Sequence, residues 1–271
     1  RDDLVNDLGD KITVQERDWN CVLMATANTK NKPFDDVRVR QALTLAVDRY
    51  SASKYLSNIA IVKTVGGIVF PGHPLAANQA EMEQLVGYSK DIEASRAKAR
   101  QLLKDAGVPE GFKFTFNNRG VDQPYKVVGT WLVDQWRKVG LDPEQTVKPS
   151  PQFYATLRKK YDFDVSIDFN CQSVINPIAD VSKFLCSAGN NYSQCDNQEI
   201  EDLYDRLMKA ATLDEQRAAM RAYEKAAVDF AGSSITLWWY KINPHRSYVK
   251  GWNIAPSHYL NQHLDNVWLD Q

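Results

Sequence analysis

The hydrophobic pattern of residues 112–169 constrains the fold of this chain more than any other feature. Apolar and polar residues alternate over 112–116 and again over 163–169, which is the period of a half-buried β-strand. Residues 141–147 are expected to form a further strand between these two. The chain therefore contains several strands close together in sequence, and the segments that join them decide how they pair.

The joining segments have the helical period instead. Residues 125–139 carry apolar side chains along one helix face, and Gly140 follows as a helix stop. Ser150 and Pro151 are expected to cap and open a helix that runs to Lys160. The resulting order, β-α-β-α-β, implies an α/β layer whose strands pair in parallel through right-handed crossovers.

Further helices and strands extend this layer. We expect helices over residues 36–49, 92–106, 197–211 and 213–230. We expect strands over residues 12–14, 22–25 and 234–242, a loop with a short strand over 59–72, and a loop-rich tail. Asp35 or Asp36 can cap the first of these helices, and a Thr212-x-x-Glu215 capping box opens the last.

The composition is that of an ordinary globular protein. The 271 residues are enough for one large domain or two smaller ones, and 44% are apolar and 25% charged, with a formal net charge of −1. This balance indicates neither nucleic-acid nor anionic-membrane binding, and no apolar run approaches the roughly 18 residues of a membrane span. Because the chain begins Arg1-Asp2-Asp3, without a start methionine or signal peptide, we expect it to be processed or cut from a longer protein.

The four cysteines are Cys21, Cys171, Cys186 and Cys195. They lack CxxC spacing and lie far in the sequence from the histidines, which argues against a zinc site. Their even number permits two disulfides in more than one connectivity, and sequence arithmetic does not choose between them. Buried free thiols in a cytosolic protein are the alternative.

Short motifs along the chain occur in an order that resembles one known family. The matching segments are Asn28-Thr29, Pro33-Phe34-Asp35-Asp36, Val39-Arg40-Gln41-Ala42, Asp48-Arg49, the helix of residues 92–107, Lys138-Val139-Gly140, Asn176-Pro177, Asn191-Tyr192-Ser193, Gly251 and Leu264-Asp265-Asn266-Val267-Trp268. Each piece is weak alone. Together and in this order they resemble the family 5 extracellular solute-binding proteins, which are the oligopeptide, dipeptide and nickel receptors of ABC importers.

The resemblance implies half of a two-lobed receptor. A complete member is about twice as long and closes two lobes over its ligand, and this chain resembles only the C-terminal part. We expect an α/β, periplasmic-binding-protein-like fold (type II, dipeptide-receptor type). Residues 1–235 would form the ligand-binding second lobe around the βαβαβ layer. Residues 236–271 would form the return strand and tail of the first lobe, whose N-terminal part is absent from the chain.

The resemblance also implies a binding protein rather than an enzyme. Family members capture a peptide or another small organic solute by hinge closure and deliver it to the permease of an ABC importer. We therefore expect a periplasmic or extracytoplasmic monomer that uses no cofactor, binds no nucleic acid and does not insert into the membrane. The alternatives are an α/β enzyme fragment with an unrecognised site, which turnover of a bound molecule would favour, and a sensory version of the same lobe.

The pairing of the cysteines follows from the same resemblance. The spacings of Cys21 and Cys171 to the prolines that follow them are similar to those of an oligopeptide receptor that joins the two positions. Cys186 and Cys195 flank a polar loop, as in dipeptide receptors. We expect the disulfides Cys21–Cys171 and Cys186–Cys195, which argue for export and against a cytosolic sensor.

Arg119 is the first candidate for ligand binding. It follows the strand of residues 112–116, at the sheet edge where α/β folds bind ligands. Counted back from Lys138, it resembles the dipeptide-receptor arginine that holds the ligand carboxylate, a task for which a planar guanidinium is suited. The ligand is therefore expected to carry an anionic group. The ordinary alternative is a solvated loop arginine.

Ser173 stands where peptide receptors have an aspartate that holds the ligand's amino group, counted back from Pro177. A serine can hydrogen-bond an ammonium group but cannot neutralise its charge. Asp168 is the candidate substitute, or else a polar residue of the strand face, and Asn170 on the same strand is a further candidate contact. Whether ligands with a free amino group are bound, and which ligand this is, stay open at the level of sequence.

Common signatures of catalysis and metal binding do not occur in the sequence. The histidines, His73, His245, His258 and His263, show neither metal spacing nor an HExxH motif. GxSxG, GxGxxG and P-loop motifs are also missing. The aromatic run at residues 238–240 could line a pocket but is expected to be core.

Overall fold

The computed structural model describes residues 1–173, 175–257 and 263–270. Its strands are β1 (Ile12–Ala27), β2 (Val62–Thr64), β3 (Phe112–Arg119), β4 (Leu141–Lys148), β5 (Val165–Cys171), β6 (Ser233–Arg246), β7 (Val249–Lys250) and β8 (Trp268–Leu269). Six of them form one sheet in the order β2-β6-β1-β5-β3-β4, and β7 and β8 form a separate pair.

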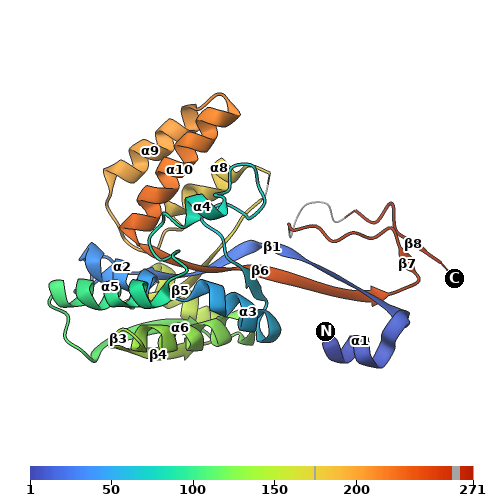
Figure 1. The fold of residues 1–271 in the computed structure, drawn as a ribbon, viewed down its shortest axis with the longest axis horizontal. Coiled ribbons are helices and arrows are strands. Elements are labelled where there is room, and N and C mark those ends of the chain that lie inside the picture. Colours follow the sequence, from blue (N-terminus) through green and yellow to red (C-terminus); the bar gives the residue numbers. More distant parts are fainter. Residues whose placement is uncertain (174, 258–262, 271) are drawn as a thin grey trace.

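Apart from α1, which lies beside the far end of β1 and β6, the helices lie on both sides of this sheet (Figure 1). They are α1 (Asp2–Leu8), α2 (Val37–Leu45), α3 (Arg49–Ile59), α4 (Gln79–Met82), α5 (Ile92–Asp105), α6 (Val127–Arg137), α7 (Ser150–Ala155), α8 (Pro177–Asp180), α9 (Gln198–Lys209) and α10 (Leu213–Phe230). Shorter helical turns are η1 (Gly9–Lys11), η2 (Asp122–Lys126), η3 (Thr156–Lys160) and η4 (Val181–Phe184).

The β-α-β-α-β segment forms the expected parallel layer. β3 pairs in parallel with β4 along its whole length and with β5 through Phe116 and Asn117. β1 then joins the other edge of β5 in antiparallel register, with Cys21 opposite Cys171, and pairs with β6 in the same way. The predicted α/β class is therefore confirmed, as a mixed sheet in which only part of the strands are parallel.

The alternation of side chains along β1 divides the interior into two cores. Cys21, Leu23 and Ala25 point into the core shared with α2, α5 and α6, whereas Val22 and Met24 point into the core shared with α9 and α10. Because successive residues of a strand face opposite sides, one strand buried on both faces serves both cores. In Figure 1 the two groups of helices lie on opposite sides of β1.

β1 and β6 continue beyond the sheet as a two-stranded ribbon. Their pairing extends from Asp18 opposite Tyr240 to Ile12 opposite Arg246. Over this part the side chains are half-buried or exposed, unlike the fully buried stretch that follows in β1. Figure 1 shows the ribbon projecting from the helical body toward α1 and the pair β7–β8.

Several local predictions are confirmed. Of the two candidates Asp35 and Asp36, Asp36 caps α2 by accepting a backbone N–H of the first turn. The capping box of Thr212 and Glu215 opens α10. The aromatic run at residues 238–240 is buried, as expected for core.

Other local predictions are wrong. A single helix over 36–49 does not form, because Asp48 accepts the backbone N–H of Ser51 and so caps a second helix, α3. The stretches at 12–14 and 22–25 belong to one long strand. Ser150 is not a cap, since its hydroxyl accepts a hydrogen bond from Arg119 instead. The N-terminal helix α1 was not predicted, because its short sequence has no clear apolar face.

Within the described residues, no helix combines the length and apolar character that crossing a membrane requires.

Candidate functional site

Arg119 ends β3, so its side chain lies at the C-terminal edge of the parallel strands. Its Nε donates to Ser150 Oγ at 2.9 Å, and its Nη1 donates to the Tyr125 hydroxyl at 3.2 Å. Burial raises the pKa of Tyr125 to about 12, so this hydroxyl stays neutral while it accepts the bond. Both partners are uncharged, and they fix the direction of the guanidinium without neutralising it.

Two tyrosine rings flank the same guanidinium. Arg119 Cζ lies 4.9 Å from the ring centroid of Tyr125 and 5.2 Å from that of Tyr154. Across the part of the chain that the structure describes, no carboxylate is close enough to Arg119 to form an ion pair. Arg119 is thus a half-buried, positioned cation whose charge no protein group offsets.

Arg158, in η3, is a second cation at this edge. Its Cζ lies 4.3 Å from the centroid of the Tyr154 ring and 5.9 Å from that of Tyr192. Burial raises the pKa of Tyr192, the charge of Asp168 acts in the same direction, and the Arg158 guanidinium opposes both. The Arg158 residue is exposed and has no carboxylate partner within the described ranges.

Asp168 is buried and engaged. One of its oxygens accepts from Lys183 Nζ at 2.7 Å, and both side chains of this ion pair are almost inaccessible, with exposures of 6% for the lysine and 3% for the aspartate. Thr26 Oγ1 and the Phe169 backbone N–H also donate to Asp168. Lys183 Nζ donates in addition to the Asn190 carbonyl and lies 4.3 Å from the Tyr192 ring centroid. The aspartate is therefore neutralised from within the protein.

These side chains surround a pocket of about 210 Å³. Its lining residues are Tyr154, Arg158, Asp168, Phe169, Asn170, Cys171, Lys183, Asn190 and Tyr192. Asn170 is buried on β5, and its side-chain amide donates to the Asp180 carbonyl at 3.1 Å. Arg119 adjoins this pocket through Tyr154, which lines the pocket and contacts Arg119 as well.

Ser173 lies outside the pocket lining and belongs to a loop tied to α8. Its backbone N–H donates to both carboxylate oxygens of Asp180 at 2.9 Å, and its hydroxyl donates to one of them at 2.9 Å. A carboxylate therefore does lie beside Ser173, supplied by Asp180 and not by Asp168. This aspartate was not predicted, because nothing in the local sequence indicates that the chain turns back from α8 onto the end of β5.

The sequence-predicted residues are thus brought together only in part. Asp168 and Asn170 line one pocket, Arg119 adjoins it through Tyr154, and Ser173 lies with Asp180 beyond it. Sequence reasoning missed the aromatic and basic members of the site. These are Tyr125, Tyr154, Arg158, Lys183 and Tyr192. Of these, only Tyr192 stands in a motif that the sequence singles out, so no sequence signal marked the others.

Both expected disulfides are present and lie next to the site. The long disulfide, Cys21–Cys171, spans 150 residues of sequence and joins β1 to the end of β5. The short disulfide, Cys186–Cys195, spans 9 residues and closes the loop that carries Asn190 and Tyr192. Each bridge therefore holds one part of the pocket wall, the end of β5 or the loop with Asn190 and Tyr192.

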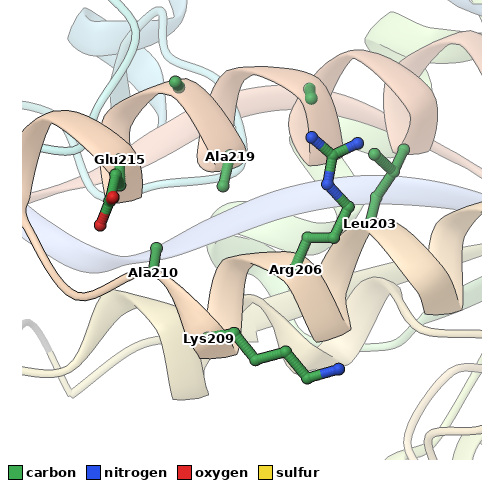
Figure 2. A pocket seen from close by; sticks show the side chains of 8 residues that line it. Leu203, Arg206, Lys209, Ala210, Glu215 and Ala219 are labelled. Atoms are coloured by element: carbon green, nitrogen blue, oxygen red, sulfur yellow. The ribbon is translucent and has the colours of Figure 1, made fainter.

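A separate groove of about 420 Å³ lies between α9 and α10. Its floor is formed largely by alanines, and Figure 2 shows Arg206 reaching from α9 toward α10 while Lys209 extends away. Glu215 at its end is already used, since its carboxylate accepts the backbone N–H groups of Ala211 and Thr212. The groove therefore offers few unused polar groups.

No group of three or more His, Cys, Asp or Glu side chains is placed to hold a metal ion anywhere in the described ranges. His258 lies outside those ranges. The chemistry of the pocket is instead that of arginine, tyrosine and amide groups, which bind anions and polar organic groups without a metal.

Comparison with known proteins identifies the family. The family model of the bacterial extracellular solute-binding proteins, family 5 (middle region), matches residues 4–192. The chain therefore belongs to the family 5 solute-binding proteins, as its motifs indicated. The relatives that match this chain are solute-binding receptors rather than enzymes.

Two relatives that match most of this chain are named as peptide-binding proteins. The dipeptide-binding protein of Escherichia coli strain K12 is 26% identical over 256 residues, covering 90% of this chain and 44% of that protein. The periplasmic oligopeptide-binding protein OppA of Haemophilus influenzae is 28% identical over 249 residues, covering 83% of this chain and 42% of that protein. The chain spans less than half of the length of either relative.

Solved structures show the same fold. The periplasmic binding protein DppA of Helicobacter pylori, in complex with the peptide STSA, superposes with a TM-score of 0.78 at 19% identity, covering 99% of this chain and 51% of that one. Haemophilus influenzae OppA in complex with RPPGFSPFR gives a TM-score of 0.76 at 20% identity, covering 100% of this chain and 52% of that one.

Proposed function

We propose that this chain is the ligand-binding lobe of the substrate-binding component of an ABC importer. It captures a peptide, or another small organic solute with an anionic group, in a cleft between two lobes and presents it to the membrane permease. The protein acts outside the cytoplasm as a monomer and catalyses no reaction. Family membership and the peptide-binding relatives support the receptor role.

Arg119 carries the proposal for the anionic group. A guanidinium that uncharged partners hold at a strand end, with no carboxylate beside it among the described residues, is poised for an anion. Its planar fork can pair bidentately with a carboxylate, and the Tyr125 and Tyr154 rings restrict its motion before the ligand arrives. The arginine side chain is therefore already ordered in the free protein, and it loses little conformational entropy when the ligand binds.

The division into lobes is proposed from the ribbon of β1 and β6. The proposed division is a ligand-binding lobe of residues 1–235 and a return strand and tail of the other lobe over residues 236–271, with the first residues of the return strand, up to Tyr240, still packed in the core of the ligand-binding lobe. The two strands leave the helical body side by side, and their burial falls along the ribbon, which is what a connection between two bodies requires. The Arg119 edge then faces the first lobe when the receptor closes.

The test uses the complete receptor that contains this chain. Native mass spectrometry first identifies the solute that copurifies with it. Titration calorimetry then compares wild type with Arg119→Ala, which should weaken binding by about 2–4 kcal/mol, roughly 30- to 1000-fold, because a charge-assisted contact in a closed cleft is lost.

Arg137→Ala is the matched control. Arg137 is also an arginine, but it lies on α6 and pairs with Asp142 at 3.3 Å on the surface. Its loss should leave the affinity unchanged. If Arg119→Ala binds the copurified solute within about twofold of wild type, Arg119 is only a surface arginine and the proposed anion contact is wrong.

A further inference from the structure

Two arginines share one tyrosine ring at the edge of the sheet. The guanidinium carbons of Arg119 and Arg158 lie 5.2 and 4.3 Å from the centroid of the Tyr154 ring. They can therefore be no further apart than the sum of these two distances. At about 3.5 Å for each residue of an extended peptide, this upper limit is spanned by at most about three residues.

The charge of this pair of arginines is not offset locally. Asp168 is the acidic residue of the adjoining pocket, and Lys183 neutralises it through a buried ion pair at 2.7 Å. Lys148, at the end of the neighbouring strand β4, adds positive charge and contacts Thr156 rather than an acid. Two like charges held against one ring repel each other, so the arrangement favours anions that lie close to both.

The pocket beside Arg158 also offers neutral polar groups. Asn170, Asn190 and Tyr192 line it, and the ion pair of Lys183 and Asp168 forms part of its wall. Its volume of about 210 Å³ is suited to a side chain and too small for a whole peptide. The short disulfide holds the Asn190–Tyr192 part of the wall.

We propose that Arg158 and this pocket form a second anion-binding subsite, and that the ligand is a peptide whose acidic side chain lies next to its terminal carboxylate. Arg119 takes one carboxylate and Arg158 takes the other. This inference rests on the proposed function, since it deepens the ligand class of the same receptor.

The test compares two peptides that differ by one charge at nearly equal size. Ala-Glu and Ala-Gln are titrated into the complete receptor by calorimetry, and the quantity measured is the ratio of their dissociation constants. Wild type should prefer Ala-Glu by about tenfold or more, because only its side chain can make a charge-assisted contact with Arg158. Arg158→Gln should reduce the preference to about twofold or less.

Lys159→Gln is the matched control, because it removes the same charge from an exposed neighbour that does not line the pocket. It should keep the preference of wild type, which separates a local contact from a general effect of net charge.

Each remaining outcome decides between the two proposals. A wild-type ratio near one, or a preference that persists in Arg158→Gln, overturns the second subsite. If Ala-Gln binding is nevertheless lost in Arg119→Gln, the proposed function stands without it. If neither peptide binds wild type, the peptide ligand class is overturned, and the second subsite with it.

Discussion

The buried ion pair of Lys183 and Asp168 allows a prediction about stability that the structure makes quantitative. Lys183→Met keeps the length of the side chain and removes its charge, which leaves the Asp168 carboxylate buried without a cation. Removing one partner of a buried pair typically costs about 3–5 kcal/mol, because the remaining charge loses its compensation. Here both side chains are almost fully buried, at 6% and 3% exposure, and the 2.7 Å contact is direct.

The expected loss lies toward the lower end of that range, about 3 kcal/mol. Asp168 keeps two hydrogen bonds, from Thr26 Oγ1 at 3.2 Å and from the Phe169 N–H at 2.8 Å, and these still stabilise its carboxylate. The mutation also removes the contact between the ammonium group and the Tyr192 ring at 4.3 Å. For a chain of this size the loss corresponds to a fall in melting temperature of about 6–12 °C.

The assay is denaturant unfolding followed by tryptophan fluorescence, with the double variant Lys183→Met/Asp168→Asn as the control. Removing both charges should recover part of the loss, since no uncompensated buried charge then remains. A loss of less than about 1 kcal/mol in Lys183→Met would refute the reasoning, because it would mean that the pair is hydrated and weak.

Three further predictions concern the bridges, a helix cap and the Ser173 loop. Peptide mapping without reduction should recover the long and the short disulfide, and any crossed pairing contradicts the assignment. Replacing the cysteines by serine should lower the free energy of unfolding by at most about 5 kcal/mol for the long disulfide and by about 3 kcal/mol for the short one. Asp36→Ala should destabilise the chain by about 1 kcal/mol at neutral pH through loss of the α2 cap. The hydrogen bond with Arg38 lowers the pKa of Asp36 below its usual 3.8, so the ionised carboxylate stabilises the fold above pH 3.8 and loses this contribution as the pH falls through the lowered pKa. The difference in stability between Asp36→Ala and wild type should shrink over the same range. A difference that stays constant across acidic pH would contradict a contribution from the ionised carboxylate. The family register alone would favour Ser173→Asp for binding an amino group. We expect this variant to lower the free energy of unfolding by about 1–3 kcal/mol, because a second carboxylate replaces a hydroxyl that donates to Asp180. Unchanged stability would show that the loop relaxes freely.

The order of strands and helices followed from the sequence because each element buries one face, and that requirement leaves a period in the chain. The alternation over 112–116 and 163–169 and the helical stripe over 125–139 have their counterparts in β3, β5 and α6. The boundaries were less well determined. α2 ends at Leu45 and Asp48 caps α3, whereas the apolar period alone predicted one continuous helix over residues 36–49.

The candidate site divides in the same way. Arg119 could be found because it lies just past the predicted strand of residues 112–116 and matches the register of the family's arginine, and a strand end fixes the edge of the sheet where the side chain lies. The cysteine pairing came from the family resemblance, and the structure joins the same pairs.

Only the tertiary structure decided which charges meet. Lys183 lies in a turn 15 residues after Asp168 and forms an ion pair with it. Asp168, which the sequence suggested as a ligand contact, is therefore neutralised within the protein. Arg158 meets Arg119 across Tyr154, and Asp180 turns back onto Ser173. Local periodicity carries no information about such contacts, because the energy of a charge pair depends on its distance and burial in space and not on its separation along the chain.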